Sequence, residues 1–349
     1  MPQTLSRRAL LAGTALLAPA AAVSLPRRIR LAILGLEGHT GELLDPLPLL
    51  PDVELVAVSD ADPARRAKFA KPGVRPYADH LELLNAEKPD VAALCGNHAE
   101  RATLLLACAQ RKINVISEKP LAITTADLAK VRRAVTESGI HLSMLISMRF
   151  LPEFQALHEV VASGDIGDVV QISAQKSYKL GARPAWMKKR ATYGGTIPYI
   201  GIHLVDLMRF TTGRDLLHLA SHETRVGHPE LADMENTAVS LFRLDNGGNA
   251  SFHLDYCRPE SASSHGDDRL RIAGTKGVVE YQENVGVTLI AEGRPARKID
   301  PLPPAKWLLV DFLEHVYSGK PSGLPLADIY RANEIVLEAR DAADRIKKT

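Results

Sequence analysis

The first half of the chain alternates between short apolar runs and segments with helical spacing. The apolar runs are rich in Val, Ile, Leu and Ala, and each is followed by a turn and a helical pattern. This alternation predicts β-α-β units and therefore a parallel sheet. The predicted strands are residues 28–34, 53–60, 89–96 and 113–120, with 140–148 also strand-like, and the predicted helices are 64–70, 99–112 and 126–139.

The second half has a different pattern. Short runs of alternating apolar and polar residues are separated by turn sequences such as DNGG and GTKG, which is typical of antiparallel hairpins. The runs are 168–178, 237–244, 249–256, 268–274 and 277–282, a helical pattern covers 200–210, and two amphipathic helices end the chain. The whole pattern predicts an α/β fold, in which a doubly wound parallel sheet precedes an α+β domain with a large, mostly antiparallel open sheet.

The length of 349 residues fits two domains. We predict a first domain at 27–148 and a second at 149–349, whose last helices are candidates for packing back on the first. The formal net charge of +2 lacks the basic excess of a nucleic-acid binder, so no nucleic-acid partner is expected. The three cysteines form no CxxC pair, and the cluster at 265–268 has no second histidine or cysteine at ligand spacing. No metal site is therefore predicted.

The first 26 residues have the pattern of an export signal. Arg7 and Arg8 precede an uncharged apolar run, residues 9–22, that ends in small residues. Paired arginines at this place are typical of the twin-arginine type. The run is shorter than the ~20 apolar residues of a membrane-spanning helix. We therefore predict a periplasmic protein, exported by the twin-arginine route, without a stable membrane anchor.

A turn with three glycines, Gly35, Gly38 and Gly41, follows the first predicted strand. Glycines there let the backbone approach a pyrophosphate, whose charge the next helix N-terminus meets. Glu37 occupies the second glycine position of the usual pattern, so we expect a longer turn with this carboxylate directed away from the phosphates. Asp60 follows Gly41 by 19 residues, the place of a carboxylate that binds the adenosine ribose. The pattern predicts a Rossmann-type site for NAD, with NADP as the alternative.

Glu118, Lys119 and Pro120 end the fourth predicted strand, at the edge where open α/β sheets bind ligands. The segment around them resembles the Glu-Lys-Pro segment of the glucose-fructose oxidoreductase, inositol dehydrogenase and MocA (Gfo/Idh/MocA) family. Further segments resemble this family in the same order: LHEVVASGDIGDVVQI, GGTIPYIGIHLVDLMRFTTG, LRIAGTKGVVEY and FLEHVYSGKP. The similarity extends over nearly the whole chain after the predicted signal.

The resemblance implies an NAD(P)-dependent oxidoreductase that acts on a CH–OH group of a sugar, cyclitol or glycoside. It implies that Lys119 lies beside the nicotinamide and holds the substrate hydroxyl, that Glu118 contacts the cofactor ribose, and that Asn97 lies near the nicotinamide end. His203 matches the family's catalytic histidine in its Gly-x-His-x-x-Asp segment, where it would act as a general base. Asp206 lies one helical turn further on and is placed to orient the imidazole.

One position departs from the family. Many relatives carry an aspartate four residues before the catalytic histidine, where this chain has Tyr199. A phenol donates a hydrogen bond where a carboxylate would stabilise a charged imidazolium. Tyr199 is therefore predicted to act toward the substrate or to leave the histidine less basic. Further candidates for substrate contacts are Tyr178, Arg183, Trp186 and Arg149. The first three lie in one segment, for which a basic surface loop is the alternative interpretation.

Three functions are open at this point. The first is an exported NAD(P)-dependent oxidoreductase with a tightly bound cofactor, since the twin-arginine route carries folded proteins and the periplasm supplies little free NAD. The second is a glycosidase or epimerase that oxidises its substrate transiently and recycles the cofactor internally. The third is a non-catalytic dinucleotide or sugar sensor, against which the pair of Lys119 and His203 argues. The expected partners are a small carbohydrate substrate and further copies of the chain, as a dimer or tetramer.

Overall fold

The computed structural model describes residues 22–346 and divides the chain into two compact units. The first unit comprises residues up to 122 together with 126–145 and 307–326. The second unit comprises 123–125, 146–306 and the residues from 327 onward. Most of the predicted export signal, up to residue 21, lies outside the described residues.

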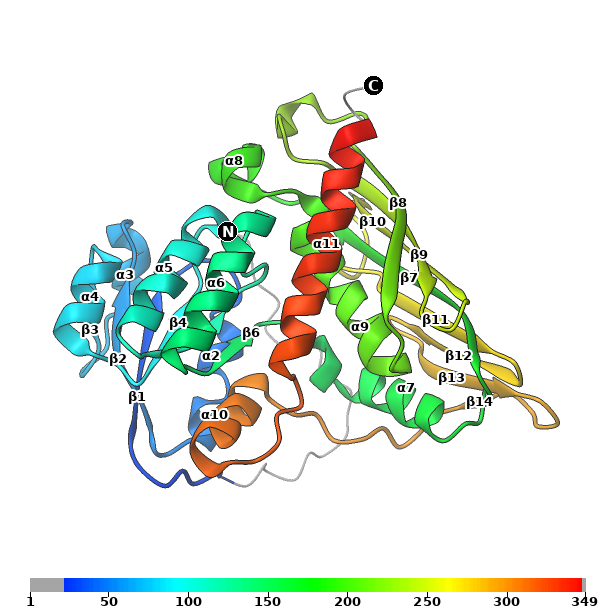
Figure 1. The fold of residues 1–349 in the computed structure, drawn as a ribbon, viewed down its shortest axis with the longest axis horizontal. Coiled ribbons are helices and arrows are strands. Elements are labelled where there is room, and N and C mark those ends of the chain that lie inside the picture. Colours follow the sequence, from blue (N-terminus) through cyan, green and yellow to red (C-terminus); the bar gives the residue numbers. More distant parts are fainter. Residues whose placement is uncertain (1–21, 347–349) are drawn as a thin grey trace. The chain divides into compact units, whose positions relative to one another are not determined.

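Six parallel strands form the sheet of the first unit, in the order β3-β2-β1-β4-β5-β6 (Figure 1). They are β1 (Ile29–Leu34), β2 (Val53–Ser59), β3 (Arg75–Tyr77), β4 (Val91–Leu94), β5 (Asn114–Ser117) and β6 (Leu142–Met144). The central strands are buried along almost their whole length, as parallel strands covered on both faces are. The strand order reverses between β1 and β4, and open sheets bind ligands where their carboxyl ends meet at such a point.

The helices of the first unit lie between successive strands of this sheet, except the last, which follows the strands of the second unit along the chain. They are α2 (Gly41–Leu44), α3 (Pro63–Lys68), α4 (His80–Glu87), α5 (His98–Gln110), α6 (Thr125–Ser138) and α10 (Leu308–Ser318), with a 3-10 turn at Leu47–Leu49. Asp62, Asp79 and Asn97 accept backbone N–H groups with their side chains and thereby cap α3, α4 and α5. The helix after the glycine turn is a single turn that ends at Leu44, and Pro46, two residues later, has no N–H with which to continue it.

Eight strands form the sheet of the second unit, in the order β14-β13-β12-β11-β7-β10-β9-β8. They are β7 (Val169–Lys179), β8 (Leu216–Thr224), β9 (Thr237–Leu244), β10 (Asn249–Arg258), β11 (Arg269–Gly274), β12 (Gly277–Gln282), β13 (Gly286–Ala291) and β14 (Arg297–Lys298). β7 and β10 pair in parallel, and the other neighbours are antiparallel. The predicted fold class, a parallel sheet followed by a mostly antiparallel one, is confirmed.

One face of the second sheet is covered by helices. The helices of this unit are α7 (Pro152–Ala162), α8 (Arg190–Tyr193), α9 (Ile202–Thr212) and α11 (Leu326–Ile346), with a π-helix at Ile197–Gly201 and 3-10 turns at Ser147–Phe150, Ala185–Lys188 and Pro229–Leu231. α7 packs on β12 and β13, and α9 packs on β7 (Figure 1). The sheet also carries exposed large apolar side chains: Val170, Leu217, Leu219, Val239, Leu241 and Ile290.

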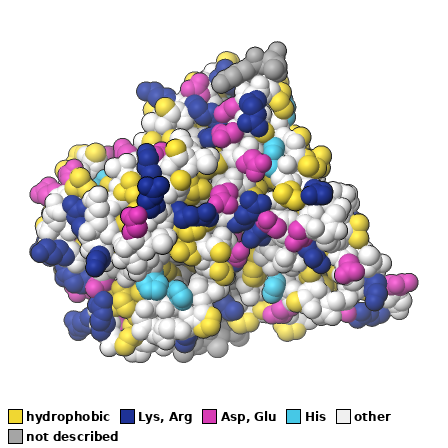
Figure 2. Space-filling model, viewed as in Figure 1, with side chains coloured by type: hydrophobic (Ala, Val, Ile, Leu, Met, Phe, Trp, Pro, Cys, Tyr) yellow, Lys and Arg dark blue, Asp and Glu magenta, His cyan; other side chains and the backbone are white. Residues whose placement is uncertain are grey.

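Charges of both signs are interspersed on the face shown in Figure 2, which agrees with the small net charge of the sequence. Within residues 22–346, no helix is long and apolar enough to cross a membrane. The same residues contain no group of three or more His, Cys, Asp or Glu side chains placed to hold a metal ion.

Candidate functional site

The turn after β1 approaches the loops after β4 and β5 so closely that two positions require glycine. Gly35 and Gly38 have φ values of +79° and +69°, which side chains disfavour. A Cβ atom on Gly35 would lie 2.4 Å from Cα of Gly96, and one on Gly38 would lie 2.6 Å from Oε1 of Glu118. Gly41 begins α2. The turn therefore packs directly against the loops after β4 and β5 at the carboxyl edge of the sheet.

Asp60 follows β2 at the same edge and is only 5% exposed. Its Oδ2 accepts a hydrogen bond from the Leu36 N–H at 2.9 Å, and its Oδ1 accepts one from the Asp62 N–H at 2.8 Å. These bonds fix the carboxylate next to the glycine turn. A carboxylate has about four acceptor positions, so Asp60 can still accept hydrogen bonds from ribose hydroxyls.

A buried carboxylate joins the glycine turn to the Glu-Lys-Pro segment. Oε1 of Glu118 accepts the His39 N–H at 2.6 Å and lies 2.6 Å from His39 Nδ1, while Oε2 accepts the Lys119 N–H at 3.1 Å. Burial by itself would raise the pKa of Glu118, but the neighbouring His39, Lys119 and Arg101 side chains hold this pKa well below its usual range. Glu118 therefore stays ionised and orders both segments.

Lys119 is 2% exposed and directly follows β5 and Glu118. Arg101, on α5, is also buried. It donates hydrogen bonds to the carbonyl oxygens of Pro120 at 2.7 Å and of Gly96 at 2.9 Å and so holds this segment in place. Sequence reasoning missed Arg101 and His39. Two features of the sequence could have indicated them: an arginine on the apolar face of α5 and a histidine inside the glycine turn. An arginine on an apolar face is informative because a buried charge needs polar partners.

Asn97 is the N-cap of α5. Its side-chain oxygen accepts the Ala99 N–H at 3.0 Å, so a contact with a cofactor would use its amide nitrogen. His98, beside it, is buried at the first position of α5. The predicted place of Asn97 near the nicotinamide stays a prediction.

The donor set of the first unit fits a dinucleotide. A glycine-rich turn at the carboxyl end of β1 suits the pyrophosphate, and a fixed carboxylate after β2 suits the adenosine ribose. The buried Glu118-Lys119 pair lies at the same carboxyl edge of the sheet. The residues that would hold the cofactor are Gly35, Gly38, Gly41, Asp60, Asn97 and Glu118.

His203 and Tyr199 lie on one continuous helical segment of the second unit. Tyr199 belongs to the π-helix Ile197–Gly201, and His203 belongs to α9, which follows without a break. Single π-helical turns are frequent at functional sites. The rings of Tyr199 and Tyr193 contact edge to face, with centroids 5.5 Å apart. The helix predicted over 200–210 contains His203, whereas the π-helical turn that holds Tyr199 just before it was not predicted.

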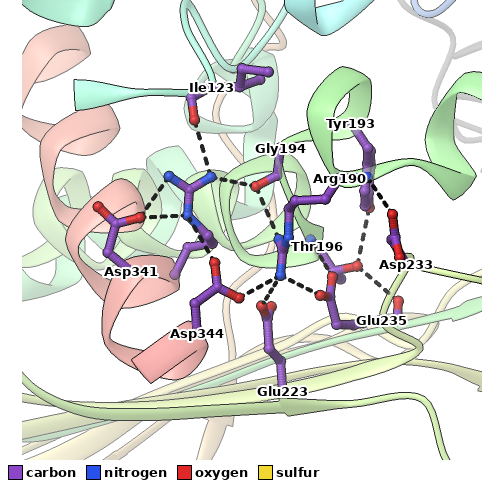
Figure 3. Close-up of polar contacts among 11 residues, drawn as sticks. Ile123, Arg190, Tyr193, Gly194, Thr196, Glu223, Asp233, Glu235, Asp341 and Asp344 are labelled. Carbon is purple, nitrogen blue, oxygen red and sulfur yellow. Dashed lines mark hydrogen bonds and ion pairs between the residues drawn. The ribbon is translucent and has the colours of Figure 1, made fainter. Parts of the chain in front are cut away.

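A polar cluster fixes the backbone immediately before this π-helix (Figure 3). The Thr196 N–H donates to Oε2 of Glu235 at 3.2 Å, and its hydroxyl donates to the Glu235 carbonyl at 2.8 Å. The Gly194 carbonyl accepts from Arg190 at 3.1 Å and from Arg340 at 2.6 Å. These bonds to Gly194 and Thr196 therefore fix the turn that leads into Tyr199 and His203.

Arg190 is the centre of this cluster. Its Nη2 forms ion pairs with Glu223 at 2.8 Å, with Asp344 at 2.7 Å and with Glu235 (Figure 3). Burial by itself would lower the pKa of Arg190, but the three carboxylates raise it. The same residues line a cavity of about 430 Å³. Nothing in the local sequence pattern marks these four residues as neighbours.

The predicted aromatic substrate contacts gather around two buried tyrosines, Tyr193 and Tyr256. Tyr178, in β7, has its ring centroid 6.4 Å from that of Tyr256, and the Arg183 guanidinium lies 4.4 Å from the Tyr256 ring centroid. The Trp186 ring lies 6.5 Å from that of Tyr193. Burial raises the pKa of all three tyrosines, so these phenols stay neutral and serve as hydrogen-bond donors. Substrate contact by Tyr178, Arg183 and Trp186 stays a prediction.

Arg149 and Asp206 are buried and bind each other. Arg149 Nε donates to Oδ2 of Asp206 at 3.0 Å, and its Nη2 binds the other carboxylate oxygen. Arg149 also pairs with Asp328 of α11 at 3.3 Å. The pair therefore ties α9 to the segment before α7 and to α11. The predicted contacts of these two residues with substrate, and of Asp206 with the His203 imidazole, stay predictions.

The comparisons with known proteins agree with this geometry. Residues 29–145 match the oxidoreductase family with an NAD-binding Rossmann fold, and residues 154–280 match the GFO/IDH/MocA C-terminal domain. The two matches define the class, an oxidoreductase with an NAD-binding Rossmann domain. A solved oxidoreductase structure from Thermotoga maritima is 31% identical, with a TM-score of 0.85, over 90% of this chain and 98% of that chain. The chain belongs to the Gfo/Idh/MocA family, which confirms the predicted family.

Curated relatives are more distant. The trans-1,2-dihydrobenzene-1,2-diol dehydrogenase of Mus musculus is 27% identical over 68% of this chain and 69% of its own length. The myo-inositol 2-dehydrogenase of Thermotoga maritima is 26% identical over 75% of this chain and 77% of its own length. Both names describe dehydrogenases of hydroxylated rings.

Proposed function

We propose that this oxidoreductase uses NAD to oxidise a secondary hydroxyl of a sugar or cyclic polyol. The observation that carries the proposal is buried Lys119 at the carboxyl end of β5, on the sheet edge that also holds the glycine turn and Asp60. The two curated relatives support the substrate class, since each is named for a ring with neighbouring hydroxyl groups.

Three residues of the chain supply the groups that this chemistry needs. Bound NAD⁺ supplies the acceptor for the hydride that leaves the substrate carbon. Lys119 donates a hydrogen bond to the substrate oxygen, and His203 accepts the hydroxyl proton as that oxygen becomes a carbonyl. Tyr199 donates a second hydrogen bond to the substrate from the π-helix.

Formation of NADH tests the proposal. The purified protein with NAD⁺ is offered a panel of cyclic polyols and sugars that includes myo-inositol, and NADH is followed by its absorbance. We expect NADH with at least one of these compounds, and none with a Lys119→Ala variant that still binds NAD⁺. A Lys119→Ala variant with the wild-type rate would contradict the assignment.

The alternative with internal cofactor recycling is distinguished in the same assay. It requires that a glycoside be cleaved, or a sugar epimerised, without added NAD⁺ and without accumulation of NADH. The predicted export favours it, because a protein outside the cytoplasm cannot draw on a large pool of free NAD. Analysis of the products by chromatography, together with the absorbance measurement, distinguishes net oxidation from internal cofactor recycling.

We expect the Tyr199→Phe variant to lose about tenfold in kcat, the effect of one hydrogen bond to a reacting group. Phenylalanine keeps the edge-to-face contact with the Tyr193 ring, so the thermal midpoint should stay unchanged. Steady-state kinetics and a melting curve measure the two effects. Unchanged kcat and KM would remove Tyr199 from the site.

We further propose that the protein is exported with its cofactor already bound, and that the signal ends before Val23. Residues 23–25 already pack on the first unit: the Val23 N–H donates to the Leu49 carbonyl at 2.7 Å, and Leu25 is 6% exposed. Cleavage further into the chain would remove these contacts. We expect N-terminal sequencing of the exported protein to find Val23, or a residue shortly before it, as the first residue. A mature chain that begins after Leu25 would contradict this.

Self-association stays a prediction. The exposed apolar side chains of the second sheet, among them Val239 and Leu241 on β9, form the surface on which we propose that a second copy packs.

A further inference from the structure

Three carboxylates surround Arg65 on α3, the helix that follows β2 and Asp60. Its Nη1 forms an ion pair with Glu37 of the glycine turn and lies 3.5 Å from Oδ1 of Asp60, and its Nε lies 3.6 Å from Oδ2 of Asp62. The Glu37 side chain is only 18% exposed. Glu37 occupies a position where the usual fingerprint has glycine. Its side chain is thus directed away from the turn and toward Arg65.

We propose that the Glu37–Arg65 ion pair excludes the 2′-phosphate of NADP and restricts the enzyme to NAD. The inference rests on the proposed function, because it concerns the adenosine end of the same dinucleotide site. Asp60 stands where the ribose hydroxyls bind, and NADP carries its additional phosphate there. A site that accepts this phosphate needs a cation directed at it, and Arg65 is held by Glu37 instead.

The neighbouring arginine does not replace Arg65 in this role. Arg66 directs its Nη1 at the backbone, where it donates to the carbonyl oxygens of Asp60 and of Ala61, the latter at 3.1 Å. These bonds keep the guanidinium at the end of β2. Arg66 therefore caps the strand and leaves Arg65 as the cation nearest to the Asp60 carboxylate.

The local charge reinforces the exclusion. Glu37, Asp60 and Asp62 together outweigh the single charge of Arg65, so a phosphate placed here meets a net negative field. NAD carries neutral hydroxyls at the same place and is unaffected. Glu37 therefore has a double effect, because it both occupies the arginine and adds a negative charge.

Dissociation constants for NAD⁺ and NADP⁺, measured by titration calorimetry, test the inference without any turnover. The set is the wild type, Glu37→Gln, Arg65→Gln and the double variant. We expect Glu37→Gln to bind NADP⁺ about tenfold more tightly than the wild type does, with NAD⁺ affinity nearly unchanged. The double variant should lose this gain, because the released arginine is what binds the phosphate.

Glu54→Gln is the matched control. Glu54 is exposed near the start of β2, and its replacement removes the same charge about 20 Å from Asp60. An unchanged NADP⁺ affinity in Glu37→Gln, or a gain that survives in the double variant or appears equally in Glu54→Gln, overturns the inference. A wild-type protein that binds neither dinucleotide overturns the proposed function itself.

Discussion

The His203→Gln variant is expected to lose about 10²–10⁴-fold in kcat while it binds NAD⁺ as the wild type does. General-base assistance contributes an effect of this size, and the cofactor residues lie in the other unit, so their contacts are unaffected. Glutamine is tolerated in a helix and can hydrogen-bond but cannot accept the hydroxyl proton. Steady-state kinetics with the substrate found by the NADH assay, and calorimetric titration of NAD⁺, measure both halves of this prediction.

His253→Gln is the matched control, because His253 lies at an exposed position of β10 in the same unit. This variant should keep the wild-type kcat. A His203→Gln variant with nearly wild-type kcat would show that another residue accepts the proton.

Replacement of Arg190 by methionine is expected to lower the free energy of unfolding by about 3 kcal/mol. The side chains of Glu223 and Glu235 are 0% and 3% exposed, and removal of their shared cation leaves two buried carboxylates without it. Trp186 is the tryptophan of the second unit, and its ring lies near that of Tyr193, which is close to the Arg190 cluster. Its fluorescence during chemical denaturation, recorded in a Trp307→Phe background, measures the loss of stability in this unit.

Arg225→Met provides the comparison for Arg190→Met. Arg225 is exposed, lines the same cavity and carries the same charge. Its replacement should change stability by no more than about 0.5 kcal/mol, as at most surface positions. Equal stability of the two variants would mean that the carboxylates do not depend on Arg190. The folded fraction of Arg190→Met should also have a lower kcat, since the Gly194–Thr196 turn that Arg190 holds leads directly to Tyr199.

Hydrophobic periodicity predicted most of the fold because the buried strands repeat a clear pattern. Along β11, for example, the buried Leu270 and Ile272 alternate with the exposed Arg269 and Arg271. β3 was missed because Arg75–Tyr77 is a short, largely exposed strand at the sheet edge with a proline in it. β8 was missed because Leu217 and Leu219 are apolar but exposed, which disturbs the expected alternation.

The candidate site could be predicted only where it depends on local pattern. The glycine turn, Asp60 and Glu118-Lys119 are each recognisable within a few residues. The Arg190 cluster is not, because Arg190 lies 33 residues from Glu223 and 154 from Asp344 along the chain. Likewise the partner of Glu37 could not be read from the sequence, since it depends on how α3 returns toward the glycine turn.

The dinucleotide that co-purifies with the protein tests the central proposal most directly. The protein is purified without added cofactor and denatured, and the released small molecules are identified and counted by mass spectrometry. We predict about one NAD⁺ or NADH per chain, and no NADP. A folded protein that releases no dinucleotide and does not bind added NAD⁺ would contradict the account.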